Sequence, residues 1–109
     1  MLETLLGSVN AERALVFILA REEGYAREIA RFYETNNYSV QKQLDKFEMG
    51  GILVSKLAGR TRVYSFNLRY PFLKELSDLL TKALSFYSSE DQEKLTMNRR
   101  RPRRREKPL

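Results

Sequence analysis

Residues 25–66 read YAREIARFYETNNYSVQKQLDKFEMGGILVSKLAGRTRVYSF, and they carry most of the information about the fold. Apolar residues recur at helical spacing in the first half, and runs of β-forming residues replace them after Gly50 and Gly51. Such glycines commonly end a helix because they adopt the left-handed cap conformation at low cost. The pattern predicts four elements, which are helices at about 26–33 and 37–49 and strands at 52–57 and 62–66.

The two helices are predicted to cross closely, as in a helix-turn-helix. That motif needs a small residue in its first helix where the second passes near it, and Ala30 fills this place. It also needs an apolar residue ten positions later, where Val40 lies and shares a face with Leu44 and Phe47. Glycine is common in the turn, but Glu34 stands there, so the turn is expected to be strained if it keeps a left-handed conformation.

The opposite face of the second helix is polar and suits the major groove of double-stranded DNA. Gln can pair with adenine and Lys can reach guanine O6 and N7, so Gln41 and Lys42 are the predicted base contacts. Other contacts to bases or phosphates are predicted for Asn37, Tyr38, Ser39 and Lys46 on the same helix and for Tyr25 and Arg27 at the start of the helix before it. An ordinary solvated helix face is the alternative interpretation of this surface.

The tip of the predicted hairpin is basic. Arg60 and Arg62 flank Thr61 beside Gly59, and arginines in this place enter a minor groove or clamp a phosphate. A charged turn that keeps the edge of the sheet soluble is the alternative. Because the tip accompanies the polar helix, we interpret Arg60, Thr61 and Arg62 as DNA contacts.

Helices are also predicted on both sides of this region. Ser8 and Asn10 are good cap residues for a first helix, which runs to about Glu22 and is apolar on so many sides that it should be buried. A last helix is predicted from Pro71 to Tyr87, with an apolar stripe about four turns long. This stripe is too long to cover a small core alone, so part of it is expected to join a second copy of the chain.

The residues predicted to form this dimer contact lie at the two ends of the chain's folded part. They are Leu2, Leu5, Leu6, Phe72, Leu76, Leu79, Leu80, Ala83, Leu84 and Tyr87. Packing of the whole stripe within one chain is the alternative.

The positive charge is concentrated at one end. Residues 99–109 hold six arginines, one lysine and one glutamate, which equals the whole formal net charge of +6. We therefore expect a domain for DNA binding and dimerisation over 1–88 and an acidic, then Arg-rich, disordered tail over 89–109. The tail is interpreted as a DNA arm that gains affinity by counterion release, with binding of RNA or another polyanion, or no role, as alternatives.

The composition excludes several kinds of chemistry. The chain has no cysteine and no histidine, which removes disulfides, thiolate metal sites and the commonest general base. No glycine-rich phosphate loop and no nucleophile-base pair occurs, so no enzyme activity, no cofactor and no metal are predicted. The longest apolar run, 14–20, is too short to span a bilayer, and we see no signal peptide. A cytoplasmic, nucleoid-associated protein with no membrane partner is expected.

Residues 8–87 resemble the small winged-helix transcriptional regulators of the ArsR-like and MarR-like superfamily. The stretch VQKQLDK at 40–46 followed by GIL at 51–53 is similar to the end of their recognition helix and their first wing strand, and GRTRVY at 59–64 is similar to their wing. The resemblance implies a homodimer on a palindromic operator. The chain departs from the family at Glu34, and it lacks the Cys and His of the metal-sensing members.

The predicted fold class is mainly α with a small β-hairpin, a winged helix-turn-helix with a long C-terminal dimerisation helix. The predicted function is that of a sequence-specific, double-stranded DNA-binding transcriptional regulator, a repressor that acts as a homodimer. Its recognition helix is placed at 37–49 and its wing at 58–62. The alternative is a winged-helix protein-interaction module whose basic tail binds nucleic acid without specificity.

Overall fold

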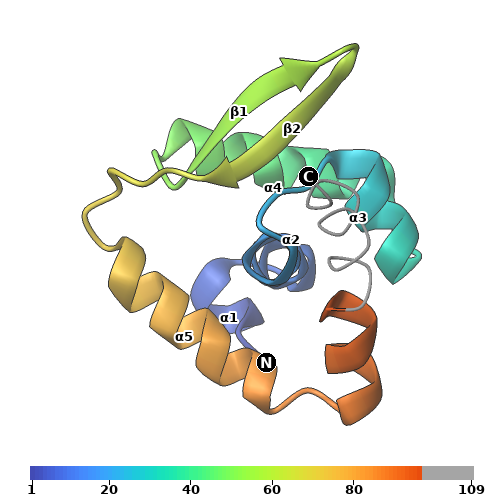
Figure 1. Cartoon of the computed structure of the whole chain (residues 1–109), viewed down its shortest axis with the longest axis vertical. Coiled ribbons are helices and arrows are strands. Elements are labelled where there is room, and N and C mark those ends of the chain that lie inside the picture. Colours follow the sequence, from blue (N-terminus) through green and yellow to red (C-terminus); the bar gives the residue numbers. More distant parts are fainter. Residues whose placement is uncertain (97–109) are drawn as a thin grey trace, which may run out of the picture.

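The fold consists of short helices around one central helix, with a two-stranded hairpin that extends from one side (Figure 1). The computed structural model describes residues 1–96. Its elements in chain order are α1 (Glu3–Leu6), α2 (Val9–Arg21), α3 (Ala26–Tyr33), α4 (Asn37–Met49), β1 (Leu53–Ala58), β2 (Thr61–Phe66) and α5 (Leu73–Ser85). Residues 89–96 are also helical.

Helix α2 forms the centre of the core. Ser8 caps it, because its Oγ accepts a hydrogen bond from the N–H of Ala11 at 3.0 Å. Leu15, Phe17 and Ile18 on this helix are fully buried. The prediction of a first helix that is buried on many sides is confirmed.

Helices α3 and α4 have the bounds predicted from the sequence. Asn36 caps α4, because its Oδ1 accepts a hydrogen bond from the N–H of Ser39 at 2.9 Å. Ala30 and Val40 are both buried in the core, as a helix-turn-helix requires. Glu34 ends α3 with φ +55° and ψ +51°, which is the left-handed conformation. The strain expected at this turn is therefore present in the backbone.

Replacing Glu34 with glycine is expected to stabilise the protein. A residue with a Cβ is strained by about 1–2 kcal/mol in the left-handed conformation, and glycine relieves this strain. The greater backbone entropy that glycine loses on folding offsets only about half of that gain. We expect Glu34→Gly to raise the melting temperature by roughly 4 °C, measured by circular dichroism. Glu34→Ala keeps the Cβ, removes the carboxylate and should leave the melting temperature unchanged. A lower melting temperature for Glu34→Gly would contradict the claim that the backbone at Glu34 is strained.

Strands β1 and β2 form an antiparallel hairpin in which Ala58 pairs with Thr61, so the loop consists of Gly59 and Arg60. Gly59 has φ +67°, and tight two-residue loops need such a positive angle. The inner face of the hairpin packs on α4 and carries Tyr64, whose exposed fraction is 1%. The predicted strands and their turn are confirmed to within one residue at each end.

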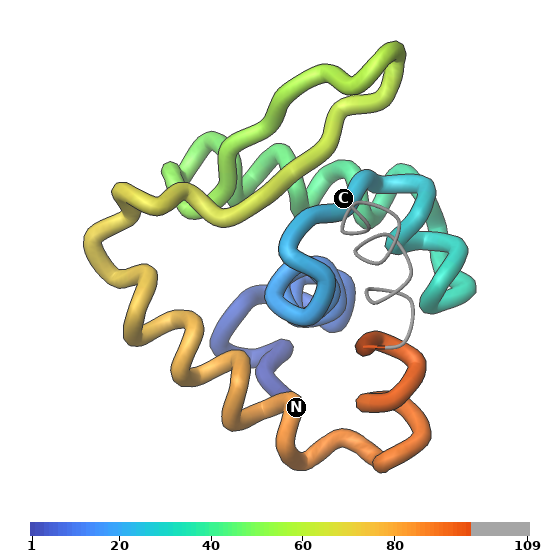
Figure 2. The backbone as a smooth tube through the Cα atoms, viewed as in Figure 1, coloured from blue at the N-terminus to red at the C-terminus, as the bar shows by residue number. Residues whose placement is uncertain are grey.

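A third stretch of chain pairs with the hairpin just before α3 (Figure 2). The N–H of Gly24 donates to the carbonyl oxygen of Tyr64 at 3.0 Å, and the N–H of Tyr64 donates to the carbonyl oxygen of Gly24 at 2.8 Å. A Cβ at position 24 would lie 3.0 Å from the ring of Phe17, so this close approach suits glycine. The bridge fixes the hairpin against the start of the helix-turn-helix.

Helix α5 is shorter than predicted. The sequence suggested a helix from Pro71 to Tyr87, whereas α5 covers Leu73–Ser85. Its end tightens, because the N–H of Phe86 donates to the carbonyl oxygen of Ala83 and the N–H of Tyr87 to that of Leu84, both at 3.0 Å. These three-residue hydrogen bonds turn the chain away from the helix axis.

The packed domain extends past the predicted boundary at residue 88. Leu95, in the helical segment 89–96, is 1% exposed and belongs to the core. Arg21 at the end of α2 holds this segment, because its Nε donates to the carbonyl oxygen of Leu95 at 3.1 Å and its Nη2 to that of Lys94 at 3.2 Å. The tail therefore does not begin at residue 89, and the disorder predicted for 97–109 lies outside the described residues.

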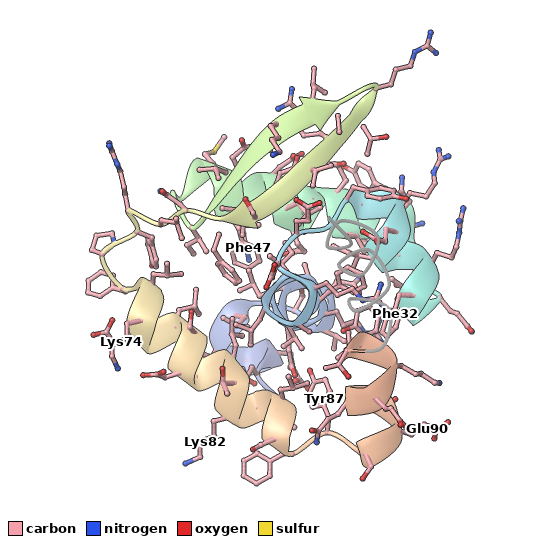
Figure 3. All side chains as sticks on the ribbon, viewed as in Figure 1. Phe32, Phe47, Lys74, Lys82, Tyr87 and Glu90 are labelled. Atoms are coloured by element: carbon pink, nitrogen blue, oxygen red, sulfur yellow. The ribbon has the colours of Figure 1, made fainter. Side chains whose placement is uncertain are left out.

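Glu12 on α2, which is 5% exposed, joins the start of the chain to the segment that follows α5. The N–H of Leu2 donates to its Oε1 at 2.6 Å, and the hydroxyl of Tyr87 (Figure 3) donates to its Oε2 at 2.7 Å. Burial acts to raise the pKa of Glu12, but the hydrogen bonds from Tyr87, Leu2 and the terminal amino group outweigh it and lower the pKa. The short helix α1 at this end was not predicted, since its four residues show too little periodicity.

Candidate nucleic-acid interface

The N-terminal half of α4 presents an open polar face. Asn37, Tyr38 and Lys42 are exposed, with 72% of Tyr38 accessible, and Ser39 is half-buried. Val40, Leu44 and Phe47 on the other side are buried, so the two faces separate as the periodicity predicted. Among residues 1–96, no side chain binds Tyr38 or Lys42, so both are available to a ligand.

Gln41 differs from its neighbours because it is half-buried and already bound within the protein. Its Nε2 donates to Asp45 Oδ1 and to the hydroxyl oxygen of Tyr64, both at 2.9 Å. The Tyr64 hydroxyl in turn donates to Asp45 Oδ1 at 3.3 Å. Gln41, Asp45 and Tyr64, which we call the triangle, thus join α4 to strand β2.

A second polar contact lies one helical turn further along α4. Ser55 on β1 donates from its Oγ to Glu48 Oε2 at 2.7 Å, and Arg62 on β2 donates from Nη1 to Ser55 Oγ at 2.9 Å. We call the two contacts together the polar seam, which comprises Gln41, Asp45 and Glu48 on α4 and Ser55, Arg62 and Tyr64 on the hairpin. The seam fixes the angle between helix and hairpin.

The pKa of the Tyr64 hydroxyl is raised above its usual range. Burial raises the pKa of the Tyr64 hydroxyl, and the nearby carboxylates of Asp45 and Glu48 raise it further, while the hydrogen bond from Gln41 acts in the opposite direction. The hydroxyl therefore keeps its proton and remains a donor to Asp45. Sequence reasoning missed the seam, although its signal was present as polar residues four and three apart at positions 41, 45 and 48.

The structure separates the residues predicted for the wing. Arg60 is exposed at the tip of the hairpin, which extends away from the body of the protein (Figure 1). Thr61 beside it is half-buried. Arg62 is exposed but is held by Ser55 on the inner face of the hairpin. Arg60 is thus the residue of this group that is both exposed and without a hydrogen bond to another side chain of residues 1–96.

The remaining predicted contacts lie at the edges of this surface. Lys46 is exposed, but its Nζ donates to the carbonyl oxygen of Leu6 at 3.1 Å, which directs it toward α1. Arg27 is exposed on the first turn of α3. Tyr25 is half-buried before that helix, and its N–H donates to Glu28 Oε1 at 3.4 Å. The central part of the candidate interface therefore consists of the start of α4 and the hairpin tip.

The residues predicted for a dimer contact fall into two groups. Leu80 and Ala83 are buried inside this protomer, so their assignment to a dimer surface is corrected. Leu5 and Phe72 are 66% and 61% exposed. The others are half-buried, namely Leu2, Leu6, Leu76, Leu79, Leu84 and Tyr87.

Two observations concern other kinds of site. In the described part of the chain, no cluster of three or more acidic side chains has the arrangement of a metal site. No helix within residues 1–96 has the length and apolar character needed to cross a bilayer.

The order of helix, helix, turn, helix and hairpin defines a winged helix-turn-helix fold. No family model matches the chain, and no curated protein matches it in sequence. Among solved structures, a variant of ZitR from Lactococcus lactis in its apo form matches with a TM-score of 0.54 and 22% identity, over 82% of this chain and 76% of that one. The transcriptional regulator BldR from Sulfolobus solfataricus matches with a TM-score of 0.52 and 14% identity, over 94% and 79%. At these identities the likeness shows a shared fold.

Proposed function

We propose that the protein is a sequence-specific, double-stranded DNA-binding transcriptional regulator. The observation that carries the proposal is the open polar face at the start of α4, where Tyr38 and Lys42 have no side-chain partner among residues 1–96, beside a basic hairpin tip. In proteins of this fold such a helix enters the major groove with its N-terminal half. The likeness to BldR, which is named as a transcriptional regulator, and the resemblance to ArsR-like and MarR-like regulators support the same role. Location at the nucleoid in the cytoplasm follows from that role.

The proposed contacts divide between bases and backbone. Gln41 and Lys42 contact bases, and Arg60 enters the minor groove or clamps a phosphate. The other proposed contacts to bases or phosphates are Tyr25, Arg27, Asn37, Tyr38, Ser39, Lys46, Thr61 and Arg62. Binding of the recognition helix at 37–49 then sets which sequence is preferred, and the wing at 58–62 adds affinity.

Replacing Gln41 and Lys42 together with alanine is expected to remove most of the preference for the natural site. Each lost base contact reduces discrimination by about 1–3 kcal/mol, so we expect at least a tenfold loss. The measurement compares the binding of the purified chain to a duplex from its own upstream region and to a scrambled duplex, over about 50–200 mM salt. Lys82→Ala on α5, on the far side from the hairpin (Figure 3), is the control for lost positive charge.

Two outcomes would redirect the proposal. Equal and steeply salt-dependent binding to both duplexes would leave only non-specific affinity, and the recognition face would then be sought as a protein-binding surface. An unchanged preference in the double variant would show that specificity resides elsewhere on the protein.

We further propose that the regulator is a homodimer and a repressor. A two-fold dimer places two recognition helices about 34 Å apart, which is one turn of DNA. Leu5 on α1 and Phe72 just before α5 are the residues of the predicted dimer contact that remain exposed to a second copy, and a dimer that covers its operator blocks access to it. We expect light scattering of the purified chain to give twice the protomer mass. The mass of one protomer at micromolar concentration would remove the dimer from the proposal.

A further inference from the structure

The amide group of Gln41 has only one orientation that satisfies its neighbours. Asp45, as a carboxylate, offers acceptors only, so the atom of Gln41 that lies 2.9 Å from Asp45 Oδ1 must be the donor nitrogen. The second N–H of the same nitrogen is used by the hydroxyl oxygen of Tyr64. That hydroxyl then gives its own proton to Asp45. Every donor in the triangle has one acceptor.

The reversed orientation would place two acceptors in contact. Gln41 Oε1 would then lie against Asp45 Oδ1 without a proton between them, and this repulsion disfavours the reversal. The triangle therefore engages both N–H groups of Gln41 and leaves Oε1 outside it. This oxygen accepts no hydrogen bond from residues 1–96, and it is not one of their buried unpaired atoms, which are Tyr33 Oη and Gln43 Oε1. Gln41 Oε1 therefore reaches solvent, on the helix that also carries the exposed Tyr38 and Lys42.

We propose that Asp45 and Tyr64 are positioning residues that make Gln41 present only an acceptor to DNA. This inference rests on the proposed function. In the major groove, hydrogen-bond donors occur at adenine N6 and cytosine N4, whereas guanine presents the acceptors O6 and N7 and thymine presents O4. At the base that it contacts on one DNA strand, Gln41 thus favours adenine or cytosine. A free glutamine would instead bind adenine through both its oxygen and its nitrogen.

Asp45→Asn is the substitution that tests the inference. An asparagine at position 45 donates as well as accepts, so both orientations of the Gln41 amide become satisfied. Base preference is measured by selecting bound duplexes from a randomised pool with the full chain. We expect wild type to favour adenine or cytosine over guanine by about fivefold at one position, near the lower limit for a base contact. Asp45→Asn should reduce this ratio to about one and leave the other positions unchanged.

Three variants separate this effect from simpler ones. Glu34→Gln removes one negative charge beside α4 without touching the triangle, and it should keep the preference. Gln41→Ala should lose the preference at the same position as Asp45→Asn. The double variant Gln41→Glu with Asp45→Asn keeps the net charge and presents an acceptor again, so it should restore the preference. A residue with a merely structural role would not give this rescue.

Nuclear magnetic resonance of the full chain without DNA tests the orientation directly. We expect nuclear Overhauser effects between the Gln41 side-chain amide protons and the Tyr64 ring, and their loss or weakening in Asp45→Asn. The inference would be overturned if the side-chain amide protons of Gln41 in wild type showed exchange with solvent and no nuclear Overhauser effect to the Tyr64 ring. So would a base preference in wild type that Gln41→Ala alters and Asp45→Asn does not, and this result would leave the proposed function intact. A wild type with no base preference at any position would instead defeat the proposed function, and the inference with it.

Discussion

Leu95→Ala in the full chain is expected to lower the free energy of unfolding by about 2–5 kcal/mol, the usual loss when a buried leucine is truncated. Leu95 is 1% exposed and packs into the core from a helical segment that the sequence pattern assigned to the tail. Its removal should leave a cavity, because the segment is held in place by Arg21 and cannot easily collapse into the space. Urea unfolding followed by circular dichroism measures the change as a lower midpoint at an unchanged slope.

Leu68→Ala is the matched control for this measurement. Leu68 is 86% exposed, so the same truncation there should change the stability by no more than about 0.5 kcal/mol. If Leu95→Ala behaves like Leu68→Ala, the segment 89–96 contributes nothing to the domain. The boundary at residue 88 would then be correct after all.

Removal of residues 97–109 is expected to flatten the salt dependence of DNA binding. These residues contain all the side chains that give the chain its net charge of +6. Each phosphate that such a charge neutralises contributes about −0.9 to the slope of log K against log salt. If the tail is a DNA arm, the slope should become less negative by about 5. The full chain should also lose roughly a thousandfold more affinity than the shortened chain between about 50 and 200 mM salt.

Fluorescence anisotropy on a scrambled duplex measures this difference, because site preference does not contribute there. A chain in which glutamine replaces the arginines of the tail keeps the length and removes the charge, so it should behave like the shortened chain. Equal slopes for the full and shortened chains would show that the tail does not touch DNA.

Much of the fold followed from the sequence because its signals are local. The cap at Ser8, the helical spacing of apolar residues and the glycines at 50, 51 and 59 each act within a few residues. Each of them placed an element to within two residues. Strain was expected at Glu34 if the turn kept a left-handed conformation, and Glu34 has that conformation, with φ +55°. Short helices without periodicity, such as α1, were beyond this reasoning.

The features that sequence reasoning missed depend on contacts between distant residues. Leu95 looks like part of a polar tail, and only the carbonyl contacts of Arg21, more than seventy positions away, show that it is packed. The polar stripe at 41, 45 and 48 reads as solvated surface until the hairpin is placed over it. For the same reason Leu80 and Ala83 resembled a dimer surface, although the core of one chain already encloses them.

Tyr64 connects the hairpin to both sides of the helix-turn-helix, since its backbone pairs with Gly24 and its hydroxyl contacts Gln41 and Asp45. The base of the wing is therefore clamped, while the loop at Gly59 and Arg60 is free of such contacts in the described chain. Because the inner end of the hairpin is held and its loop is not, we expect bending of the hairpin to change the reach of Arg60 without shifting α4. If α4 and the hairpin tip bind DNA as proposed, this arrangement would tolerate variation in groove width beside the site while the register of the base contacts stays constant.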